Sequence, residues 1–350
     1  MKIDDLIKQT SGWLKNIGPN SEIIFSSRVR LARNLEKAVF TNRAKKKQQE
    51  QTLELISSAV SSLESIKNKG LFLKILDMSN IDKQFLVERH LISRELAVNT
   101  DVKAVAFSVD EIISIMINEE DHMRIQVLQP GFNLDECWRK IDEVETELEK
   151  KLDFAFSVKW GYLTACPTNT GTGMRASVML HLPALVLTKQ IDRVIQAILK
   201  LGLTVRGLFG EGTEAAGNFF QISNQVSLGR SEEEIIDNIK RIIKQIIEYE
   251  QNARQVLLNQ NKSSVADQVW RSYGILKNAH IISSSETIEL LSNVRLGIDM
   301  GLIKQPTRET VNELFILTQP AHLQKLESKE LSSRERDVKR AELIRQHITA

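Results

Sequence analysis

Arginine side chains stand at alternate positions in one short segment that follows a β-rich run. In Ser26-Ser27-Arg28-Val29-Arg30-Leu31-Ala32-Arg33, the two-residue repeat of an extended chain puts Arg28 and Arg30 on the same side. Two planar guanidinium groups on one face suit adjacent phosphate groups. A solvated edge strand that uses arginine against aggregation would carry the same pattern. This segment alone leaves both interpretations open.

Three consecutive acidic residues follow an apolar run that ends at Ile117. The segment is Asn118-Glu119-Glu120-Asp121-His122-Met123-Arg124. Such a run at the end of a strand is a poor core and a good site for a cation, a metal–phosphate complex or a general base. An acidic turn is the alternative, and it is the commoner structure for such a run taken alone.

Two further segments combine glycine with charged residues. Residues 166–175, CPTNTGTGMR, lead into a helix that we expect to begin near Ala176, and their backbone N–H groups could hold an anion, although a helix-capping loop has the same composition. Residues 206–213, RGLFGEGT, indicate a mobile loop or a close approach of the backbone to a ligand.

These segments together predict a nucleotide site that has no Walker lysine. They supply two glutamates and five arginines for phosphate groups, namely Arg28, Arg30, Arg124, Arg175 and Arg206. The sequence contains no GxxxxGK[ST] motif and no GxGxxG after a strand, which excludes the P-loop and Rossmann sites. It also lacks the HRD and DFG motifs of ordinary protein kinases.

The elements that must position these residues follow from the hydrophobic pattern. Helical spacing predicts helices over 45–66, 137–152 and 180–201. Ser231 and Glu234 form a capping box before a long helix with isoleucines along one face. Short apolar runs predict the strands of an antiparallel or mixed sheet at 23–25, 71–76, 102–109, 112–117, 125–128, 205–209 and 219–228.

From about Asn261 onward the pattern predicts only helices, most clearly at 286–302, 310–317 and 334–347. We therefore expect an α+β fold in two domains: residues 1–258 form a sheet flanked by helices, and residues 259–350 form a small all-helical domain.

Composition limits the classes of function. The chain has 350 residues, of which 42% are hydrophobic and 26% charged, as in globular proteins, and its net charge of +2 predicts no bulk binding to nucleic acid or membranes. The longest apolar stretch, 178–187, is too short to span a bilayer. The N-terminus lacks the pattern of a secretory signal. The chain has only two cysteines, which predicts no disulfide scaffold and fits a reducing cytoplasm. Its six histidines show no paired spacing, so we predict no metal site.

The segments resemble the ATP:guanidino phosphotransferase (phosphagen kinase) family, whose creatine and arginine kinases share the NEEDH segment at 118–122 and the CPxNxGTxxR loop at 166–175. The sequence is similar in particular to the bacterial branch of protein-arginine kinases. That likeness includes SSRVRLARN at 26–34, RGLFGEGTEAAGNFFQISNQ at 206–225 and VRLGIDMGLI at 294–303. It implies a guanidino-kinase catalytic domain with an antiparallel sheet.

The resemblance implies a kinase that transfers the γ-phosphoryl group of ATP, with Mg²⁺, to arginine side chains of proteins. It implies that Glu120 is the base, that Glu211 is a second carboxylate on the guanidinium, and that Cys166 assists, although a structural cysteine is an alternative. It implies that the five arginines bind the phosphates. Further nucleotide contacts carried over are Ser26, Ser27, Val29, His90, Ala176, Ser177, Val178, Met179, Gly207, Leu208, Phe209, Gly210 and Glu211.

The resemblance also bears on the second domain. It implies dimerisation and an RDxxRA segment that binds phosphoarginine as an allosteric ligand, here Arg336, Asp337, Arg340 and Ala341. A charged helix face is the alternative, although i,i+4 spacing places both arginines together. Only 25 residues precede Ser26, whereas the small-molecule kinases carry a helical domain there, which favours the protein-directed branch.

The implied partners are protein substrates, a zinc-containing activator protein and the Clp protease machinery, in a cytoplasmic stress response in which phosphoarginine marks proteins for degradation. Two other functions stay open. One is a small-guanidine (arginine) phosphagen kinase. The other is a phosphoarginine-binding protein without activity, against which the intact glutamates and arginines argue.

Overall fold

The computed structural model describes residues 2–15, 18–67, 70–98, 101–207 and 216–349. At its centre is one eight-stranded sheet in which every neighbouring pair is antiparallel. The strand order is β2 (Leu71–Lys74), β3 (Ala104–Phe107), β4 (Ile113–Ile117), β5 (Met123–Pro130), β1 (Ile24–Arg33), β8 (Met174–His181), β10 (Phe219–Asn224) and β9 (Leu203–Gly207). The expected α+β class with an antiparallel sheet is confirmed.

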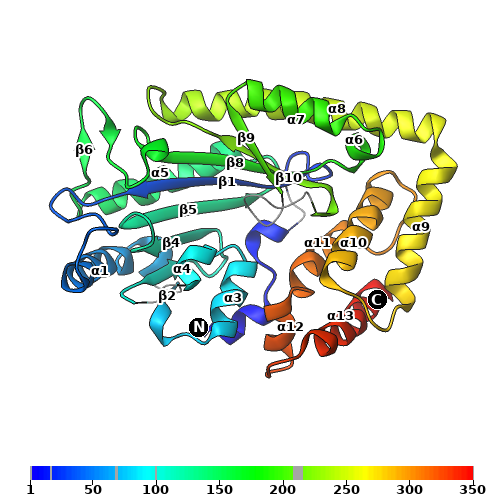
Figure 1. The fold of residues 1–350 in the computed structure, drawn as a ribbon, viewed down its shortest axis with the longest axis horizontal. Coiled ribbons are helices and arrows are strands. Elements are labelled where there is room, and N and C mark those ends of the chain that lie inside the picture. The colour runs from blue at the N-terminus through cyan, green and yellow to red at the C-terminus, as the bar shows by residue number, and fades with distance from the viewer. Residues whose placement is uncertain (1, 16–17, 68–69, 99–100, 208–215, 350) are drawn as a thin grey trace.

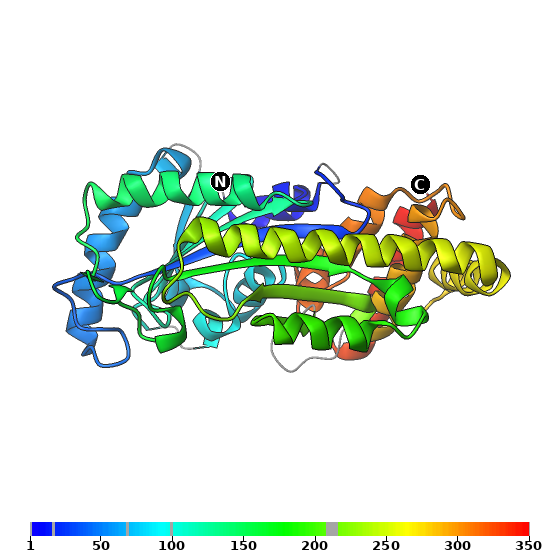
Figure 2. The same ribbon diagram turned by 90° about the horizontal axis from the view of Figure 1, so that it is seen from above.

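Helices cover one face of this sheet because its strands alternate apolar and polar residues. In β1, Val29 and Leu31 are fully buried and alternate with Arg28 and Arg30. The apolar side packs against α5 (Leu134–Glu149), α8 (Glu232–Gln260) and α7 (Ile191–Lys200), which lie along the sheet in Figures 1 and 2. Residues of α1 (Lys46–Ser61) and α2 (Glu64–Lys67) join the same core.

The other face is covered by helices at its β2–β4 end. There α3 (Asn80–Glu88) and α4 (Arg94–Val98) form a second, smaller core with Val105, Phe107 and Met116. Met116 pairs with Arg124 of β5, so this core gives way to charged side chains as the face continues across β5 and β1.

The C-terminal helices pack at one end of the sheet, opposite a small hairpin of β6 (Phe156–Ser157) and β7 (Gly161–Tyr162) (Figure 1). They are α9 (Lys262–Asn278), α10 (Ser284–Asp299), α11 (Arg308–Leu317), α12 (Pro320–Leu326) and α13 (Ser333–Thr349). The capping box is present: the Glu234 N–H donates to Ser231 Oγ at 3.2 Å. The helix that it begins, α8, runs to Gln260 and contains the expected domain boundary at 258.

Contacts tie the C-terminal helices to the sheet region at two places. Glu88 at the end of α3 accepts hydrogen bonds from the N–H groups of Ala321 and His322 in α12, at 2.8 and 3.0 Å. The turn η5 (Ala216–Asn218) packs against α10, where the Gly217 N–H donates to Glu289 at 2.8 Å. The short remaining elements are η1 (Ile3–Lys8), η2 (Gly12–Leu14), η3 (Ile75–Asp77), η4 (Pro167–Asn169) and α6 (Pro183–Leu187).

Two sequence-based expectations of local structure are wrong. No helix begins near Ala176, because residues 174–181 form β8, which is paired on both sides. The helix expected over 180–201 is instead the end of β8 followed by α6 and α7, with Lys189 in the left-handed region between them (φ 57°). Continuous apolar sequence does not distinguish a buried strand from a helix.

Within the described ranges, no helix has the length and apolar character needed to cross a bilayer.

Candidate active site

The predicted phosphate arginines lie on one face of the sheet. Arg30 of β1 stands opposite Arg175 of β8 and Gln126 of β5, and Arg124 is two residues from Gln126 on the same strand. Arg206 of β9 pairs with Gln221 of β10, whose register with β8 keeps it on this face. Because β1 is an inner strand of the sheet, the edge-strand interpretation of its arginines is wrong. We call the face of the sheet that carries Arg28, Arg30, Arg124, Arg175 and Arg206 the arginine face.

Burial and mutual repulsion perturb the central arginines. The pKa of Arg28 is lowered to about 10, first by burial and then by the charges of Arg175, Arg124 and Arg206. The pKa of Arg30 is lowered well below its usual value by burial and by Arg28. The Nε groups of Arg28 and Arg30 are buried without a hydrogen-bond partner in the described part of the chain. An anion bound here would supply the missing acceptors and offset the repulsion.

Neighbouring side chains orient two of these arginines. Arg175 Nη2 donates to Ser223 Oγ at 3.1 Å and to Thr204 Oγ1 at 3.2 Å. Arg124 binds the buried Glu119 carboxylate through both Nη groups, at 2.9 and 2.6 Å. Ser93 also donates to Glu119. Glu119 is therefore used to hold Arg124.

Glu120 differs from Glu119 in its surroundings. It lies in the β4–β5 connection, and its side chain is 44% exposed, with Oε2 3.6 Å from Arg124 Nη2. Burial raises the pKa of Glu120, and the charges of Asp121 and Glu119 add to the rise, whereas Arg124 opposes it. A half-exposed carboxylate with a raised pKa beside an anion site is suited to accept a proton.

A buried network joins the Glu120 segment to the loop that carries Cys166. Asp121 Oδ1 accepts hydrogen bonds from Asn34 Nδ2 at 2.6 Å and from the Ala165 N–H at 2.7 Å. Asn34 Oδ1 in turn accepts from the His122 N–H at 2.9 Å. The acidic segment is therefore a turn in which Asp121 and His122 fix the backbone that follows Glu120.

The two cysteines lie in different environments. Cys166 is partly exposed and its Sγ lies 3.1 Å from Thr168 Oγ1, while Ser227 Oγ donates to the carbonyls of Thr168 and Thr170 in the same loop. Cys137 is fully buried under the sheet, and burial raises its pKa. The 166–175 loop leads into a strand, so its interpretation as a helix cap is wrong.

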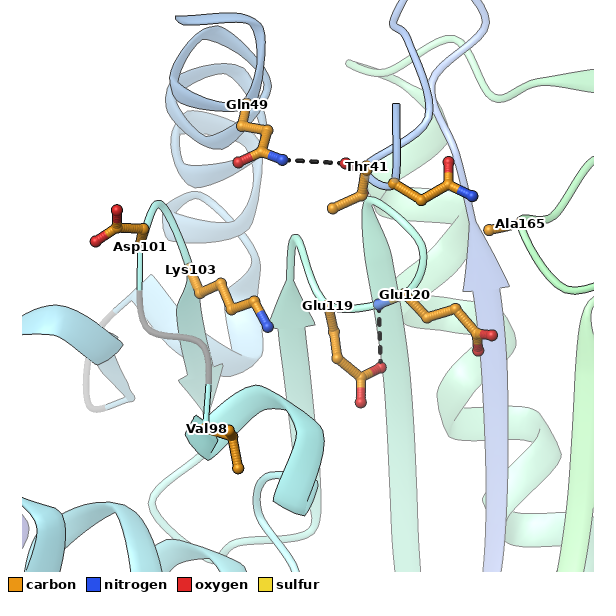
Figure 3. A pocket seen from close by; sticks show the side chains of 9 residues that line it. Thr41, Gln49, Val98, Asp101, Lys103, Glu119, Glu120 and Ala165 are labelled. Atoms are coloured by element: carbon orange, nitrogen blue, oxygen red, sulfur yellow. Dashed lines mark hydrogen bonds between the residues drawn. The ribbon is translucent and has the colours of Figure 1, made fainter. Parts of the chain in front are cut away.

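A cavity of about 700 Å³ opens beside Glu120 (Figure 3). Its lining comes from the 41–49 region, from the Glu119–Glu120 connection and from Ala165, the residue before Cys166, together with Val98, Asp101 and Lys103. Three of the lining residues are acidic, Asp101, Glu119 and Glu120, and Lys103 is the cation among the described lining residues. The cavity thus joins the Glu120 carboxylate to a surface that favours a cationic ligand.

The remaining predicted nucleotide contacts divide between the two faces. Ser26, Ser177 and Met179 share the arginine face by register, whereas Ser27, Val29, Ala176 and Val178 alternate to the helix-covered side. His90 lies beside Arg28, packs on Trp13 at 5.2 Å between ring centroids, and has a pKa lowered to about 4 by burial and by Arg28. Gly207 ends β9, and Leu208, Phe209, Gly210 and Glu211 lie outside the described residues.

The predicted phosphoarginine segment lies in α13, far from these residues in sequence. Arg340 is almost fully buried and donates to the carbonyls of Thr318 at 2.8 Å and Ile282 at 2.9 Å, and it pairs with Asp337 at 2.5 Å. Arg336 donates to the Leu331 carbonyl at 2.7 Å. Burial lowers the pKa of Arg340, and the charge of the nearby Arg336 adds to this effect, but Arg340 is used internally in this structure.

Sequence reasoning missed several residues that shape the site. Gln126, Thr204 and Ser223 lie on the arginine face, and Asp121 and Asn34 hold its loops. Alternation along 123–130 could have placed Gln126 beside Arg124. No local signal could have identified Asn34, because its partners lie at 121 and 163.

Two family models match the chain. The one described as "ATP:guanido phosphotransferase, C-terminal catalytic domain" matches residues 51–253. The one described as "Protein-arginine kinase McsB C-terminal domain" matches residues 262–350. The first match includes seven of the eight sheet strands and leaves out β1, and the second includes α9 to α13.

Relatives and solved structures agree with these matches. The chain is 52% identical to the protein-arginine kinase of Halothermothrix orenii over 99% of each chain. It is 47% identical to that of Bacillus subtilis, over 97% of this chain and 93% of the relative. The duplicated taurocyamine kinase from Schistosoma mansoni with bound transition state analog components has a TM-score of 0.62 and 30% identity, covering 72% of this chain and 36% of that one. Lombricine kinase has a TM-score of 0.58 and 25% identity, covering 71% and 75%.

Proposed function

The chain belongs to the ATP:guanido phosphotransferase family and, within it, to the protein-arginine kinases, and from this premise we propose that it transfers the γ-phosphoryl group of ATP to arginine side chains of proteins. The observation that carries the proposal is the junction at Arg124. This residue belongs to the arginine face and lies 3.6 Å from the Glu120 carboxylate. A phosphoryl group on the arginine face would therefore meet a guanidinium held by Glu120.

Phosphoryl transfer to arginine requires a carboxylate at that junction. A protonated guanidinium has no free lone pair, and its pKa exceeds ~12. Glu120 would orient the attacking nitrogen and accept its proton, and its raised pKa makes it a better proton acceptor than an exposed glutamate. Glu211 would contact the same guanidinium, with Cys166 as an auxiliary group.

Arg28, Arg30, Arg124, Arg175 and Arg206 would hold the phosphates in line with that nitrogen, and losing one such contact should slow transfer on the order of 10²- to 10³-fold. The described residues contain no group of three or more His, Cys, Asp or Glu side chains placed to hold an ion. Mg²⁺, which keeps water and phosphate oxygens as ligands, would therefore enter with the nucleotide and offset its charge.

We extend the proposal to the cellular role that the family resemblance implies. The modification would mark proteins for degradation by the Clp protease machinery in a cytoplasmic stress response. A zinc-containing activator protein would be a partner, and the C-terminal helices would form a homodimer or a larger oligomer. Phosphoarginine would bind as an allosteric ligand at Arg336, Asp337, Arg340 and Ala341. Such binding requires Arg340 to exchange the Thr318 and Ile282 carbonyls for the ligand.

Phosphorus NMR tests the central proposal. The chain is incubated with Mg²⁺·ATP and, in parallel, with an unfolded arginine-rich protein or with free arginine. We expect an acid-labile phosphorus–nitrogen signal on the protein and none on the free amino acid. A signal on free arginine alone would identify a small-guanidine kinase, and no signal on either acceptor would favour a phosphoarginine-binding protein.

The variant Glu120→Gln tests the mechanism in the same assay. It should keep ATP binding, measured by calorimetry, because the arginine face is unchanged, and it should abolish transfer because the amide cannot take the proton. Glu143→Gln is a matched control, since Glu143 is an exposed glutamate that pairs only with Arg139 among the described residues. Turnover retained by Glu120→Gln would remove Glu120 from the role of base.

A further inference from the structure

The cavity beside Glu120 is larger than one acceptor side chain requires. Its volume of about 700 Å³ lies in the range of pockets that enclose drug-sized ligands, whereas the guanidinium itself needs only the Glu120 end. Figure 3 shows Glu120 at one side of the cavity and Asp101 at the other, with Lys103 and Glu119 between them. An arginine that reaches Glu120 would therefore leave room for neighbouring groups of the same ligand.

The polar groups that line the cavity differ in the number of hydrogen bonds and ion pairs that they already make within the protein. Glu119 is bound to Arg124 and Ser93. Lys103 Nζ donates to the Glu95 carbonyl at 3.3 Å, and burial lowers the pKa of Lys103, although the Glu119 and Glu95 charges oppose this shift. The Thr41 hydroxyl is buried without a hydrogen-bond partner among the described residues. A polar ligand in the cavity could therefore supply the hydrogen-bond partner that this hydroxyl lacks.

Asp101 is the most exposed of the three acids that line the cavity. Its carboxylate pairs with Lys46 at 3.4 Å, and the two side chains are 68% and 66% exposed. Such exposed ion pairs are weak and exchange readily. A second cation on the ligand could therefore compete with Lys46 for this exposed carboxylate, which lies across the cavity from Glu120.

We propose that this cavity binds the polypeptide that flanks the acceptor arginine, and that Asp101 makes the site prefer acceptor arginines with a basic neighbouring residue. This inference rests on the proposed function and specifies its substrate class. A peptide backbone would bring hydrogen-bonding groups to the Thr41 side of the cavity. A basic neighbour would meet Asp101, and an acidic neighbour would be repelled by Asp101 and Glu120.

Three synthetic peptides test the inference, each with a single arginine flanked on both sides by lysine, alanine or glutamate. The kcat and KM for phosphorylation are measured with the full chain and with Asp101→Asn and Asp101→Lys. Asp153→Asn is the matched control, because Asp153 is 77% exposed, pairs with Lys37 at 3.8 Å and does not line the cavity.

For the unaltered chain and for Asp153→Asn we expect kcat/KM to be about three- to tenfold higher for the lysine peptide than for the glutamate peptide, mostly through KM. Asp101→Asn should remove most of this ratio, Asp101→Lys should invert it, and high salt should reduce it. An equal ratio in the unaltered chain and Asp101→Asn would overturn the inference while leaving the kinase function intact. Absence of phosphorylation of every peptide by the unaltered chain would contradict the proposed function, and the inference with it.

Discussion

Half-buried arginines of like charge face one another on β1, β5 and β8, and this arrangement lowers the stability of the protein until an anion binds. The pKa of Arg28 is lowered to about 10 by burial and by three other arginines. Its Nε is buried without a partner in the described ranges. Each of these features has an unfavourable free energy in the absence of a ligand.

Replacing Arg28 should therefore raise stability and reduce activity together. We expect Arg28→Gln to raise the Tm by about 2 °C without nucleotide, because one buried charge is removed. Transfer should fall on the order of 10²- to 10³-fold. Calorimetric scans with and without phosphate measure the first effect, and phosphate should raise the Tm of the unaltered chain more than that of the variant.

Arg139→Gln is the matched control for this experiment. Arg139 is exposed and pairs with Glu136 and Glu143 on the surface of α5, so its loss should leave the Tm nearly unchanged or slightly lower. A Tm for Arg28→Gln below that of the unaltered chain would contradict the account of repulsion on the arginine face.

At the scale of elements, the end of α3 connects the C-terminal helices to the site. Glu88 caps the N-terminus of α12 and accepts from His322 Nδ1 at 2.7 Å. The next residue, Arg89, is buried and pairs with Glu111. The carbonyl oxygen of the third residue, His90, accepts a hydrogen bond from Gln126 Nε2 on the arginine face at 2.8 Å. Three consecutive residues thus span the distance from the helical domain to the site.

Removing the Glu88 cap should destabilise the protein measurably. Glu88→Ala leaves the N–H groups of Ala321 and His322 without their acceptor, which should cost about 1–3 kcal/mol in the free energy of unfolding by urea. Glu88→Gln keeps an acceptor oxygen and should cost less. The surface variant Glu136→Ala should cost below about 1 kcal/mol, and an equally small cost for Glu88→Ala would show that the cap does not stabilise this interface.

At the scale of the whole molecule, folding holds several histidines neutral. The pKa values of four histidines are lowered, each with burial as the first cause: to about 4 for His90, well below the usual value for His181, and below it for His122 and His322. In the unfolded chain these groups take up protons near pH 6.5. Between pH 6.5 and about 4 the unfolded state therefore binds more protons than the folded state.

Stability should consequently rise with pH through this window and fall on acidification. Each histidine kept neutral contributes a loss of up to about 1.4 kcal/mol per pH unit below 6.5. We expect the Tm to be lower at pH 5.5 than at pH 7.5, and His322→Gln to weaken this dependence. Equal Tm values at the two pH values would contradict the burial of neutral histidines.

The α+β class, the long capped helix and the arginines of the arginine face were all predictable from the sequence. These features depend on local patterns, such as the alternation at 26–33, the capping box at Ser231 and the acidic run at 118–122. A short-range pattern determines local conformation and residue type, but it does not state which segments become neighbours.

The tertiary structure alone decided how those residues are used. It placed β1 inside the sheet, so Arg28 and Arg30 became half-buried and mutually repelling. It assigned Glu119 to Arg124 and left Glu120 half-exposed, although the two acids are adjacent in sequence. It turned the residues after 173 into a strand, because pairing with β1 and β10 outweighs local propensity. Strand register and burial depend on contacts between residues far apart in the chain, and no local pattern encodes them.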